Sequence, residues 1–370
     1  MIIGVPEEIM RNEKRVALVP ANVQQLVDKG HKVLIQAGAG LGSGYTDQDY
    51  LEFGADIVNV EDLWKQSDMI VKVKEPLESE YHYFRPGLII FAYLHLAANE
   101  GLTHALVRHK VTGIAYETME ENGKLPLLQP MSEIAGRFAI QAGAHFLEQQ
   151  NGGKGKLLAG VPGVERGKVV IIGGGNVGES AARIALGMGA EVKIFDINTQ
   201  RLAELENIFN NRVQTLVSNP VYIAEAVKSA DLVIGSVLVA GHKAPVLVTE
   251  DMVKNMEVGS VIVDIAIDQG GNFETSTHST SLDDPTYKSH EVIHYTVSNV
   301  PGAVPRTASQ ALTNASSRFV SLIADKGLEE LIQMNETVAK GINTYSGYVT
   351  HEGVAQSIDS PFKDIIEIVK

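Results

Sequence analysis

The sequence predicts an α/β protein with two doubly wound, Rossmann-like domains and an active-site cleft between them. Apolar runs rich in β-branched residues alternate with helix-like segments from the first residues onward, which is typical of parallel sheets covered by helices. The 370 residues are too many for one ordinary core and favour two domains. In addition, the glycine-rich stretch 173–178 lies between a predicted strand and a predicted helix, as in dinucleotide-binding proteins.

The first region of the chain alternates strand and helix without a glycine fingerprint, and reads as a doubly wound domain of its own. The predicted strands are 2–5, 32–36, 55–58, 69–73, 88–94 and 111–116, and the predicted helices are 20–29, 61–66 and 100–109. A long helix from Ser132, as its N-cap, to Gln150 and a glycine-rich segment at 151–160 then connect it to the next domain.

The central region continues the alternation. Its predicted strands begin near Lys168, Glu191, Val213, Asp231 and Ser260, and 292–297 closes the set. After Pro305 the chain turns helical at 307–324 and 328–339, with too few strand-like runs left for a further sheet. We therefore expect this tail to pack on the first domain. Residues 1–130 and 305–370 would form a discontinuous substrate domain, and residues 131–304 the NAD-binding Rossmann domain.

The glycine motif predicts a site for a dinucleotide. Gly173 allows a tight turn, Gly175 lets backbone amides approach a pyrophosphate, and Gly178 lets the helix pack closely on the strand. Asp196 ends the next strand roughly twenty residues on, where the fingerprint needs an acceptor for a ribose 2′-hydroxyl. A carboxylate there would repel a 2′-phosphate, which favours NAD over NADP. Arg201 could soften that repulsion, so NADP stays a minor alternative.

Composition excludes several classes of partner. A formal net charge of −14 without a basic run disfavours nucleic acid and anionic membrane surfaces. The absence of cysteine excludes disulfides, thiolate catalysis and a cysteine zinc site. The first residues do not resemble a signal peptide, and no apolar run approaches the roughly 18 residues that span a bilayer. We expect a cytoplasmic protein.

Polar residues that follow apolar strand runs are candidates for chemistry, because ligands bind beyond the carboxyl ends of strands in open α/β sheets. Lys74 and His95 follow strands of the first domain, Asp268 follows a strand of the second, and Arg15 lies in the loop after the first strand. Arg15 and Lys74 would hold a small anionic substrate, and His95 can exchange protons near neutral pH. We expect them to meet in the cleft.

One motif points to another chemistry. Residues 290–294 match the HExxH pattern of zinc peptidases, which works only on a helix. The β-branched and aromatic residues from Val292 to Val297 favour a strand instead, along which His290 and His294 would lie roughly 13 Å apart. Because they could not share one zinc ion, we expect no metal site.

Several motifs, in the right order and over essentially the whole chain, resemble one family, the bacterial L-alanine dehydrogenases of the alanine dehydrogenase/transhydrogenase α-subunit family. They are residues 4–8 (GVPEE), 13–18 (EKRVAL), 93–98 (YLHLAA), 130–137 (PMSEIAGR), the glycine motif, 263–271 (VDIAIDQGG) and 299–305 (NVPGAVP). Val300 departs from the methionine usual in the family, and Asn176 from a common apolar residue.

The resemblance implies a role for each candidate. Arg15 and Lys74 would bind the substrate carboxylate, His95 and Asp268 would be the catalytic acid/base residues, and Asp196 would bind the ribose. The full predicted cofactor site joins the glycine motif and Arg201 to the residues that the resemblance implies: Ser132, Gly173, Gly175, Asn176, Val177, Gly178, Asp196, Arg201, Ser218, Val237, Leu238, Ile265, Ala266, Ile267, Asp268, Val297, Ser298, Asn299 and Val300.

The implied function is an oxidoreductase of amino-acid metabolism, an NAD-dependent, reversible L-alanine dehydrogenase. It would serve L-alanine catabolism by converting L-alanine to pyruvate and ammonium, and it would assemble as a homohexamer. Three alternatives stay open: the nucleotide-binding subunit of a proton-translocating transhydrogenase, a lysine or saccharopine-type dehydrogenase with a larger pocket, and a non-catalytic NAD-binding module.

Overall fold

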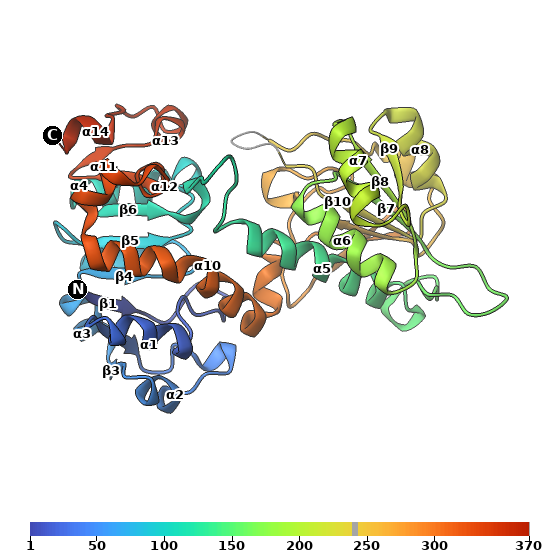
Figure 1. Cartoon of the computed structure of the whole chain (residues 1–370). Coiled ribbons are helices and arrows are strands. Elements are labelled where there is room, and N and C mark those ends of the chain that lie inside the picture. Colours follow the sequence, from blue (N-terminus) through green and yellow to red (C-terminus); the bar gives the residue numbers. More distant parts are fainter. Residues whose placement is uncertain (239–242, 370) are drawn as a thin grey trace. The chain divides into compact units, whose positions relative to one another are not determined.

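The computed structural model describes residues 1–238 and 243–369, which form two compact units (Figure 1). The first unit combines Met1–Met131 with the C-terminal segment from Val304 onward, and the second is Ser132–Ala303. Each unit contains one mixed, mostly parallel sheet with helices around it. The predicted fold class, α/β with two doubly wound domains, is confirmed.

Within the described residues, the sheet of the first unit has eight strands in the order β15-β14-β6-β5-β4-β1-β2-β3. Numbered along the chain, the six parallel strands run 3-2-1-4-5-6, the order of a Rossmann fold. The order reverses between β1 and β4, and the loops that leave these strands mark where ligands bind in such sheets. The six strands are β1 (Ile2–Val5), β2 (Lys32–Gln36), β3 (Asp56–Val58), β4 (Met69–Val71), β5 (Ile89–Ala92) and β6 (Thr112–Ala115).

Helices of the first unit come from both ends of the chain. Its α-helices are α1 (Pro20–Asp28), α2 (Asp47–Glu52), α3 (Val60–Gln66), α4 (Glu100–Arg108), α10 (Pro305–Lys326), α11 (Leu328–Met334), α12 (Glu336–Gly341), α13 (Glu352–Ser357) and α14 (Ile365–Ile368). Short 3₁₀ helices are η1 (Leu41–Ser43), η2 (Glu78–Tyr83), η3 (Leu96–Ala98) and η4 (Tyr116–Thr118). The long α10 lies beside α1 and η1, which places the C-terminal segment in this unit (Figure 1).

The C-terminal segment corrects two expectations. It contributes two strands, β14 (Ile342–Tyr345) and β15 (Tyr348–Val349), and β14 pairs antiparallel with β6. These strands were missed because they are short and carry polar residues. The helix expected over 328–339 is two helices, since Asn335 adopts an extended conformation and its side chain accepts from the amide of Val338 to begin α12.

The sheet of the second unit has seven strands within the described residues, in the order β12-β13-β11-β10-β7-β8-β9. Leaving aside the antiparallel edge strand β12, the order is again 3-2-1-4-5-6. Apolar residues of the inner strands are buried on both faces, which explains their continuous apolar runs. The strands are β7 (Lys168–Ile172), β8 (Glu191–Asp196), β9 (Gln214–Val217), β10 (Leu232–Gly235), β11 (Val261–Asp264), β12 (Thr286–Ser289) and β13 (Val292–Tyr295).

The helix that enters the second unit starts earlier than expected. Ser132 is not its N-cap, because α5 runs over Gln129–Phe146 and includes Ser132 in its first turn. Pro130 is compatible with a first turn, since the amide hydrogen that proline lacks has no partner there. The remaining helices are α6 (Asn176–Gly187), α7 (Thr199–Ile208), α8 (Pro220–Lys228) and α9 (Glu250–Lys254), with η5 (Gln149–Asn151), η6 (Ile267–Gln269) and η7 (Val300–Ala303).

Hydropathy along the helices bears on membrane insertion. Among residues 1–238 and 243–369, none of the helices combines the length and the apolar character that crossing a bilayer requires.

Candidate active site

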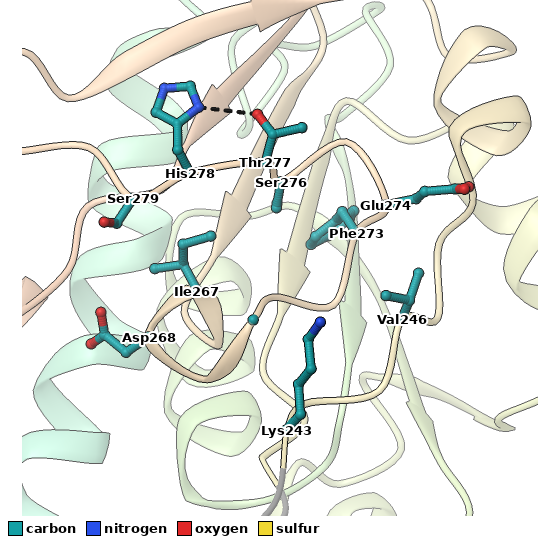
Figure 2. Close-up of a pocket in the computed structure, with 11 residues that line it drawn as sticks. Lys243, Val246, Ile267, Asp268, Phe273, Glu274, Ser276, Thr277, His278 and Ser279 are labelled. Atoms are coloured by element: carbon teal, nitrogen blue, oxygen red, sulfur yellow. Dashed lines mark hydrogen bonds between the residues drawn. The ribbon is translucent and has the colours of Figure 1, made fainter. Parts of the chain in front are cut away.

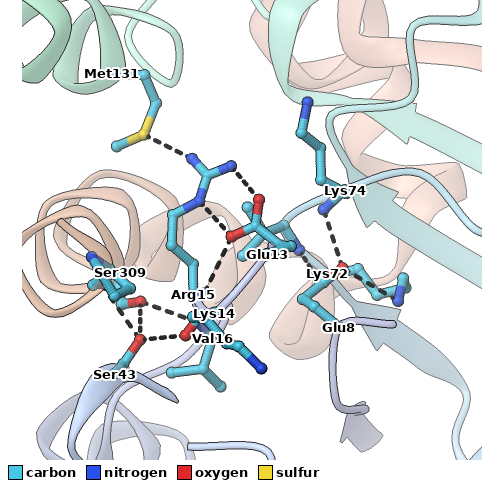
Figure 3. Close-up of polar contacts among 12 residues, drawn as sticks. Glu8, Glu13, Lys14, Arg15, Val16, Ser43, Lys72, Lys74, Met131 and Ser309 are labelled. Atoms are coloured by element: carbon cyan, nitrogen blue, oxygen red, sulfur yellow. Dashed lines mark hydrogen bonds and ion pairs between the residues drawn. The ribbon is translucent and has the colours of Figure 1, made fainter. Parts of the chain in front are cut away.

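Arg15 is buried at the carboxyl edge of the first sheet and is paired with Glu13 (Figure 3). Its Nε donates to one Glu13 oxygen at 2.7 Å and its Nη2 to the other at 2.6 Å, while Nη1 lies 3.3 Å from the Met131 sulfur. Burial works against the charged guanidinium, but the hydrogen bonds and charge of Glu13 outweigh it and raise the pKa of Arg15. Sequence reasoning missed Glu13, although an acid two residues before a functional arginine is a usable signal.

Two lysines follow β4, and only one of them is committed to protein partners. Lys72 is buried, with its ammonium 3.3 Å from Glu8 and 3.2 Å from Glu80. Lys74 is partly buried, and its ammonium has no hydrogen bond or ion pair with any residue that the structure describes. In Figure 3 that ammonium points away from Glu8. Of the two, Lys74 is therefore the cation available to an anionic ligand.

His95 follows β5 in a left-handed conformation, with φ of 49°. A β-carbon makes this region uncommon, and such residues concentrate at functional sites. Glu117 holds the backbone there by accepting from the amides of Leu94 at 3.1 Å and His95 at 2.6 Å. The same carboxylate lies 4.0 Å from His95 Nδ1, and the His95 side chain is 45% exposed. Glu117 is a second residue that sequence reasoning missed.

The three candidates of the first unit share one edge of its sheet. Arg15 lies in the loop after β1, Lys74 follows β4 and His95 follows β5, and these strands are neighbours. The buried Tyr93 interacts electrostatically with both Arg15 and Glu117. Burial raises the pKa of Tyr93, the charge of Arg15 lowers it, and the charge of Glu117 raises it. The edge thus offers an arginine, a lysine and a histidine beside two ordered carboxylates, a composition suited to a small anion that exchanges protons.

In the second unit the glycine motif adopts the turn that the sequence predicts. Gly173 has φ of 105°, and a β-carbon on Gly178 would lie 1.9 Å from the Gly173 carbonyl oxygen. A β-carbon on Gly175 would meet no described atom within 4 Å. Gly173 and Gly178 are therefore required by the fold, whereas Gly175 keeps space open just before α6. The N-terminus of a helix and an open glycine backbone together favour an anionic group.

Asp196 and Arg201 hold the two peptide groups on either side of the Gly174 α-carbon. Asp196 accepts from the amide of Gly174 at 2.7 Å, and Arg201 Nε donates to the Gly174 carbonyl at 2.7 Å. The remaining nitrogens of Arg201 donate to Glu179 at 2.6 Å and Glu204 at 3.0 Å. Burial opposes the charge of Arg201, but these carboxylates raise its pKa. Arg201 is thus engaged in ordering the turn, together with Glu179, which sequence reasoning missed.

Asp268 lies on η6 and lines a cavity of about 530 Å³ within the second unit (Figure 2). Lys243, Glu274 and His278 are among the other polar residues of its lining, and Thr277 contacts His278 at 3.0 Å. The cavity places Asp268 beside a solvent-filled space that is large enough for a small ligand.

The other predicted cofactor residues follow successive strands of the second unit. Val237, after β10, is held on both sides by Asn272, which accepts from its amide at 2.9 Å and donates to its carbonyl at 3.0 Å. Ser132 comes from the first turn of α5. Asn176 and Val177 begin α6, Ser218 follows β9, Leu238 is an exposed residue after β10, Ile265, Ala266 and Ile267 follow β11, and Val297, Ser298, Asn299 and Val300 follow β13.

The HExxH match is not on a helix. His294 lies on β13, whereas His290 lies in the turn before it with φ of 51°. His294 is buried, donates from Nδ1 to the Val292 carbonyl at 3.0 Å and accepts at Nε2 from the Thr275 hydroxyl at 2.7 Å. His290 instead contacts Glu250 at 2.8 Å. The predicted strand is confirmed, and no cluster of three metal-ligating side chains occurs in the part of the chain that the structure describes.

Two family models match the chain. Residues 4–135 match the model described as "Alanine dehydrogenase/PNT, N-terminal domain", and residues 139–352 match "Alanine dehydrogenase/PNT, C-terminal domain".

Individual relatives match over their full length. The chain is 56% identical over 371 residues to a protein of Staphylococcus haemolyticus named alanine dehydrogenase, and 54% identical over 371 residues to alanine dehydrogenase 2 of Staphylococcus aureus, with 100% of each chain covered. A solved structure named L-alanine dehydrogenase has a TM-score of 0.94 and 52% identity, covering 97% of this chain and 99% of that one. A transhydrogenase from Sinorhizobium meliloti has a TM-score of 0.83 and 27% identity, covering 95% and 99%.

The glycine turn generates a paired prediction. Gly175→Ala should fold with wild-type stability but weaken NADH binding at least about tenfold, because the added methyl group enters only the space before α6. Gly178→Ala should instead destabilise the second unit, because its methyl group would collide with the Gly173 carbonyl. Urea titration and NADH fluorescence measure the two effects. Equal loss of stability in both variants would contradict the assignment.

Two buried groups of the second unit should make its stability depend on pH with opposite signs. Burial lowers the pKa of His294 to about 4. As pH falls from 6.5 to 4, only the unfolded chain gains this proton, so the free energy of unfolding decreases. Burial raises the pKa of Asp264 to about 6, so as pH falls from 6 to 3.8 only the folded chain gains this proton and stability rises.

We therefore predict that the difference in unfolding free energy between wild type and His294→Gln shrinks by about 3 kcal/mol from pH 7 to pH 4. The difference isolates His294 because the Asp264 contribution is common to both proteins. Urea titrations at each pH measure it, and His290→Gln is the control for an exposed histidine. A difference that does not change with pH would refute the buried, neutral state of His294.

Proposed function

The chain belongs to the alanine dehydrogenase/PNT family, and on this premise we propose that it catalyses the reversible, NAD-dependent oxidative deamination of L-alanine to pyruvate and ammonium. The observation that carries the proposal is 54–56% identity to proteins named alanine dehydrogenase over the full length of both chains. The sites of the two units support it, since the first presents Arg15, Lys74 and His95 and the second a glycine turn with Asp196.

The residues of the second unit fit a dinucleotide. Gly175 leaves an open backbone before α6 for the pyrophosphate, and Asp196 stands where the ribose 2′-hydroxyl is accepted. Arg201 is already paired with Glu179 and Glu204 and is therefore not set aside for a 2′-phosphate, which supports NAD over NADP. When bound, NAD supplies the acceptor for the hydride that leaves the substrate. We assign residues 131–304 as the NAD-binding domain, and residues 1–130 with 305–370 as the substrate domain.

Arg15 and Lys74 would bind the carboxylate of alanine. Glu13 holds the Nε and Nη2 nitrogens of the guanidinium, which fixes the plane that Arg15 would present to a carboxylate. Lys74 adds a point charge to the same anion. Holding the carboxylate at two cations fixes the orientation of the Cα–H bond, which converts an encounter into a reactive geometry.

His95 and Asp268 would manage the protons. Loss of hydride from Cα leaves an iminium, which adds water to give a carbinolamine and then releases ammonium as pyruvate forms. His95 suits the proton transfers because its ring is partly exposed and Glu117 holds the backbone that carries it. Asp268, on an exposed turn of η6, is the second candidate acid/base. The reaction requires alanine held by the first unit to reach the nicotinamide held by the second.

Two further parts of the proposal rest on family membership. We propose that the chain assembles as a homohexamer and acts in the cytoplasm on free L-alanine.

The transhydrogenase subunit is the second candidate function, because the Sinorhizobium meliloti transhydrogenase shares the fold at 27% identity. It predicts nucleotide binding without oxidation of an amino acid. A non-catalytic NAD-binding module predicts the same, and the retention of Arg15, Lys74, His95 and Asp268 counts against it.

We predict rapid formation of NADH from NAD and L-alanine by the purified protein at mildly alkaline pH, followed by absorbance. D-Alanine, L-serine and L-lysine should react far more slowly, because the predicted pocket is small and chiral. NADP should replace NAD poorly, because Asp196 repels a 2′-phosphate. NADH binding without oxidation of any amino acid would overturn the dehydrogenase and favour the transhydrogenase reading, and oxidation of L-lysine would favour the larger-pocket alternative.

A variant tests the role of His95. His95→Ala should lower kcat at least about 100-fold, because a positioned acid/base group contributes on that scale, while the dissociation constant for NADH stays within twofold. Single-turnover absorbance and NADH fluorescence measure the two quantities. His104→Ala, an exposed histidine of α4 in the same unit, is the control. Turnover equal to wild type would remove His95 from the mechanism.

A further inference from the structure

We propose that Glu8 is a positioning residue that orients Lys74 toward the substrate carboxylate, and that Lys72 is the counter-ion that keeps Glu8 ionised. This inference rests on the proposed function, in which Lys74 binds that carboxylate. It assigns separate roles to two lysines that stand two residues apart and have the same chemistry.

Glu8 accepts hydrogen bonds from two consecutive backbone amides, and these bonds support its positioning role. One Glu8 oxygen accepts from the Val73 amide at 2.6 Å and the other lies 3.4 Å from the Lys74 amide (Figure 3). On the opposite side, the Val73 carbonyl accepts from the Tyr93 amide at 3.1 Å. The backbone that leaves β4 is therefore held from both sides just before Lys74, which fixes the direction in which the Lys74 side chain leaves it.

Because Glu8 is buried, its hydrogen bonds to the Val73 and Lys74 amides depend on a nearby positive charge that keeps its carboxylate ionised. The Glu8 side chain is only 3% exposed and that of Lys72 only 1%. Lys72 bridges Glu8 at 3.3 Å and Glu80 at 3.2 Å, and Glu80 accepts in turn from the Leu77 amide at 2.8 Å. An ionised carboxylate this deeply buried is stable only beside a cation and hydrogen-bond donors. Lys72 supplies the charge and is not available to a substrate.

The charges around Glu8 explain why the direction of Lys74 matters. The titratable groups that interact electrostatically with Glu8 are Lys72 after β4, Glu80 on η2, Tyr116 on η4, and Glu13 and Arg15 after β1. In the fully ionised state, the carboxylates of Glu8, Glu13 and Glu80 carry three negative charges, and the buried Lys72 and Arg15 carry two positive charges. Lys74 adds a further cation at this edge of the sheet, where an anionic substrate would approach.

Glu8→Gln tests the positioning role. The amide side chain keeps the shape of Glu8 but loses its charge, and its NH₂ group cannot accept from a backbone amide. We expect KM for L-alanine to rise about tenfold and kcat to fall by a smaller factor, with KM for NAD within twofold, because a misdirected Lys74 would hold and orient the substrate carboxylate less well. Asp68→Asn is the matched control, since Asp68 accepts from the Ile2 amide at 2.7 Å and so ties β1 to β4 at the amino end of the same strands.

Lys72→Met tests the counter-ion role through pH. Burial already raises the pKa of Glu8, and loss of Lys72 would raise it further, so Glu8 would take up a proton as pH falls. The ratio of variant to wild-type KM for L-alanine should therefore grow at least fivefold from pH 10 to pH 7. The ratio for Glu8→Gln should stay constant, because glutamine does not titrate. A merely structural defect predicts a ratio independent of pH in both variants.

The outcomes separate this inference from the proposed function. Wild-type protein that does not oxidise L-alanine would overturn the proposed function before any variant is compared. Active wild type with an unchanged KM for L-alanine in folded Glu8→Gln would overturn the positioning role. If Glu8→Gln does not fold, a pH-independent KM ratio in Lys72→Met would still overturn the counter-ion role. An equal rise in KM for Asp68→Asn would show a general loosening of the two strands instead.

Discussion

Compensation of buried charge governs the carboxyl edge of the first sheet. Arg15 and Lys72 are shielded from water, and an ionised group in such a place is stable only when opposite charges and hydrogen bonds replace its hydration. Glu13 does this for Arg15, and Glu8 with Glu80 does it for Lys72. The loops after β1 and β4 are consequently linked by the Glu8–Lys72 ion pair and by the hydrogen bonds from the Val73 and Lys74 amides to Glu8. Rigid support of this kind is needed to position a small ligand that offers few groups for recognition.

The two units use one strand order for two kinds of recognition. Both sheets run 3-2-1-4-5-6, so both place loops at a reversal point. In the second unit the backbone forms the candidate site, because Asp196 and Arg201 order the two peptide groups that flank the Gly174 α-carbon and Gly175 keeps its surroundings open. In the first unit charged side chains form it. The fold therefore fixes where a ligand binds, whereas the loop residues decide which ligand that is.

Sequence patterns predicted most strands because the inner strands are buried on both faces and read as unbroken apolar runs. The strands β12, β14 and β15 escaped, since they are short and partly polar. Arg15, Lys74 and His95 were identified from their positions after strands. Glu8 was not, because its carboxylate meets an amide 65 residues away and no local pattern reports such a contact. Asn272 escaped for the same reason, since it holds Val237 across a loop.

Because the first unit is discontinuous in sequence, the two units are completed at different times during synthesis. The second unit, Ser132–Ala303, is contiguous, so a ribosome delivers all of it before the first unit is complete. Until α10 and β14 emerge, the nascent first unit exposes the apolar surface that α10 will cover and an unpaired edge along β6. Completion of the first unit therefore waits until its C-terminal segment has been synthesised, and the interval before then is when the unit is most exposed to aggregation.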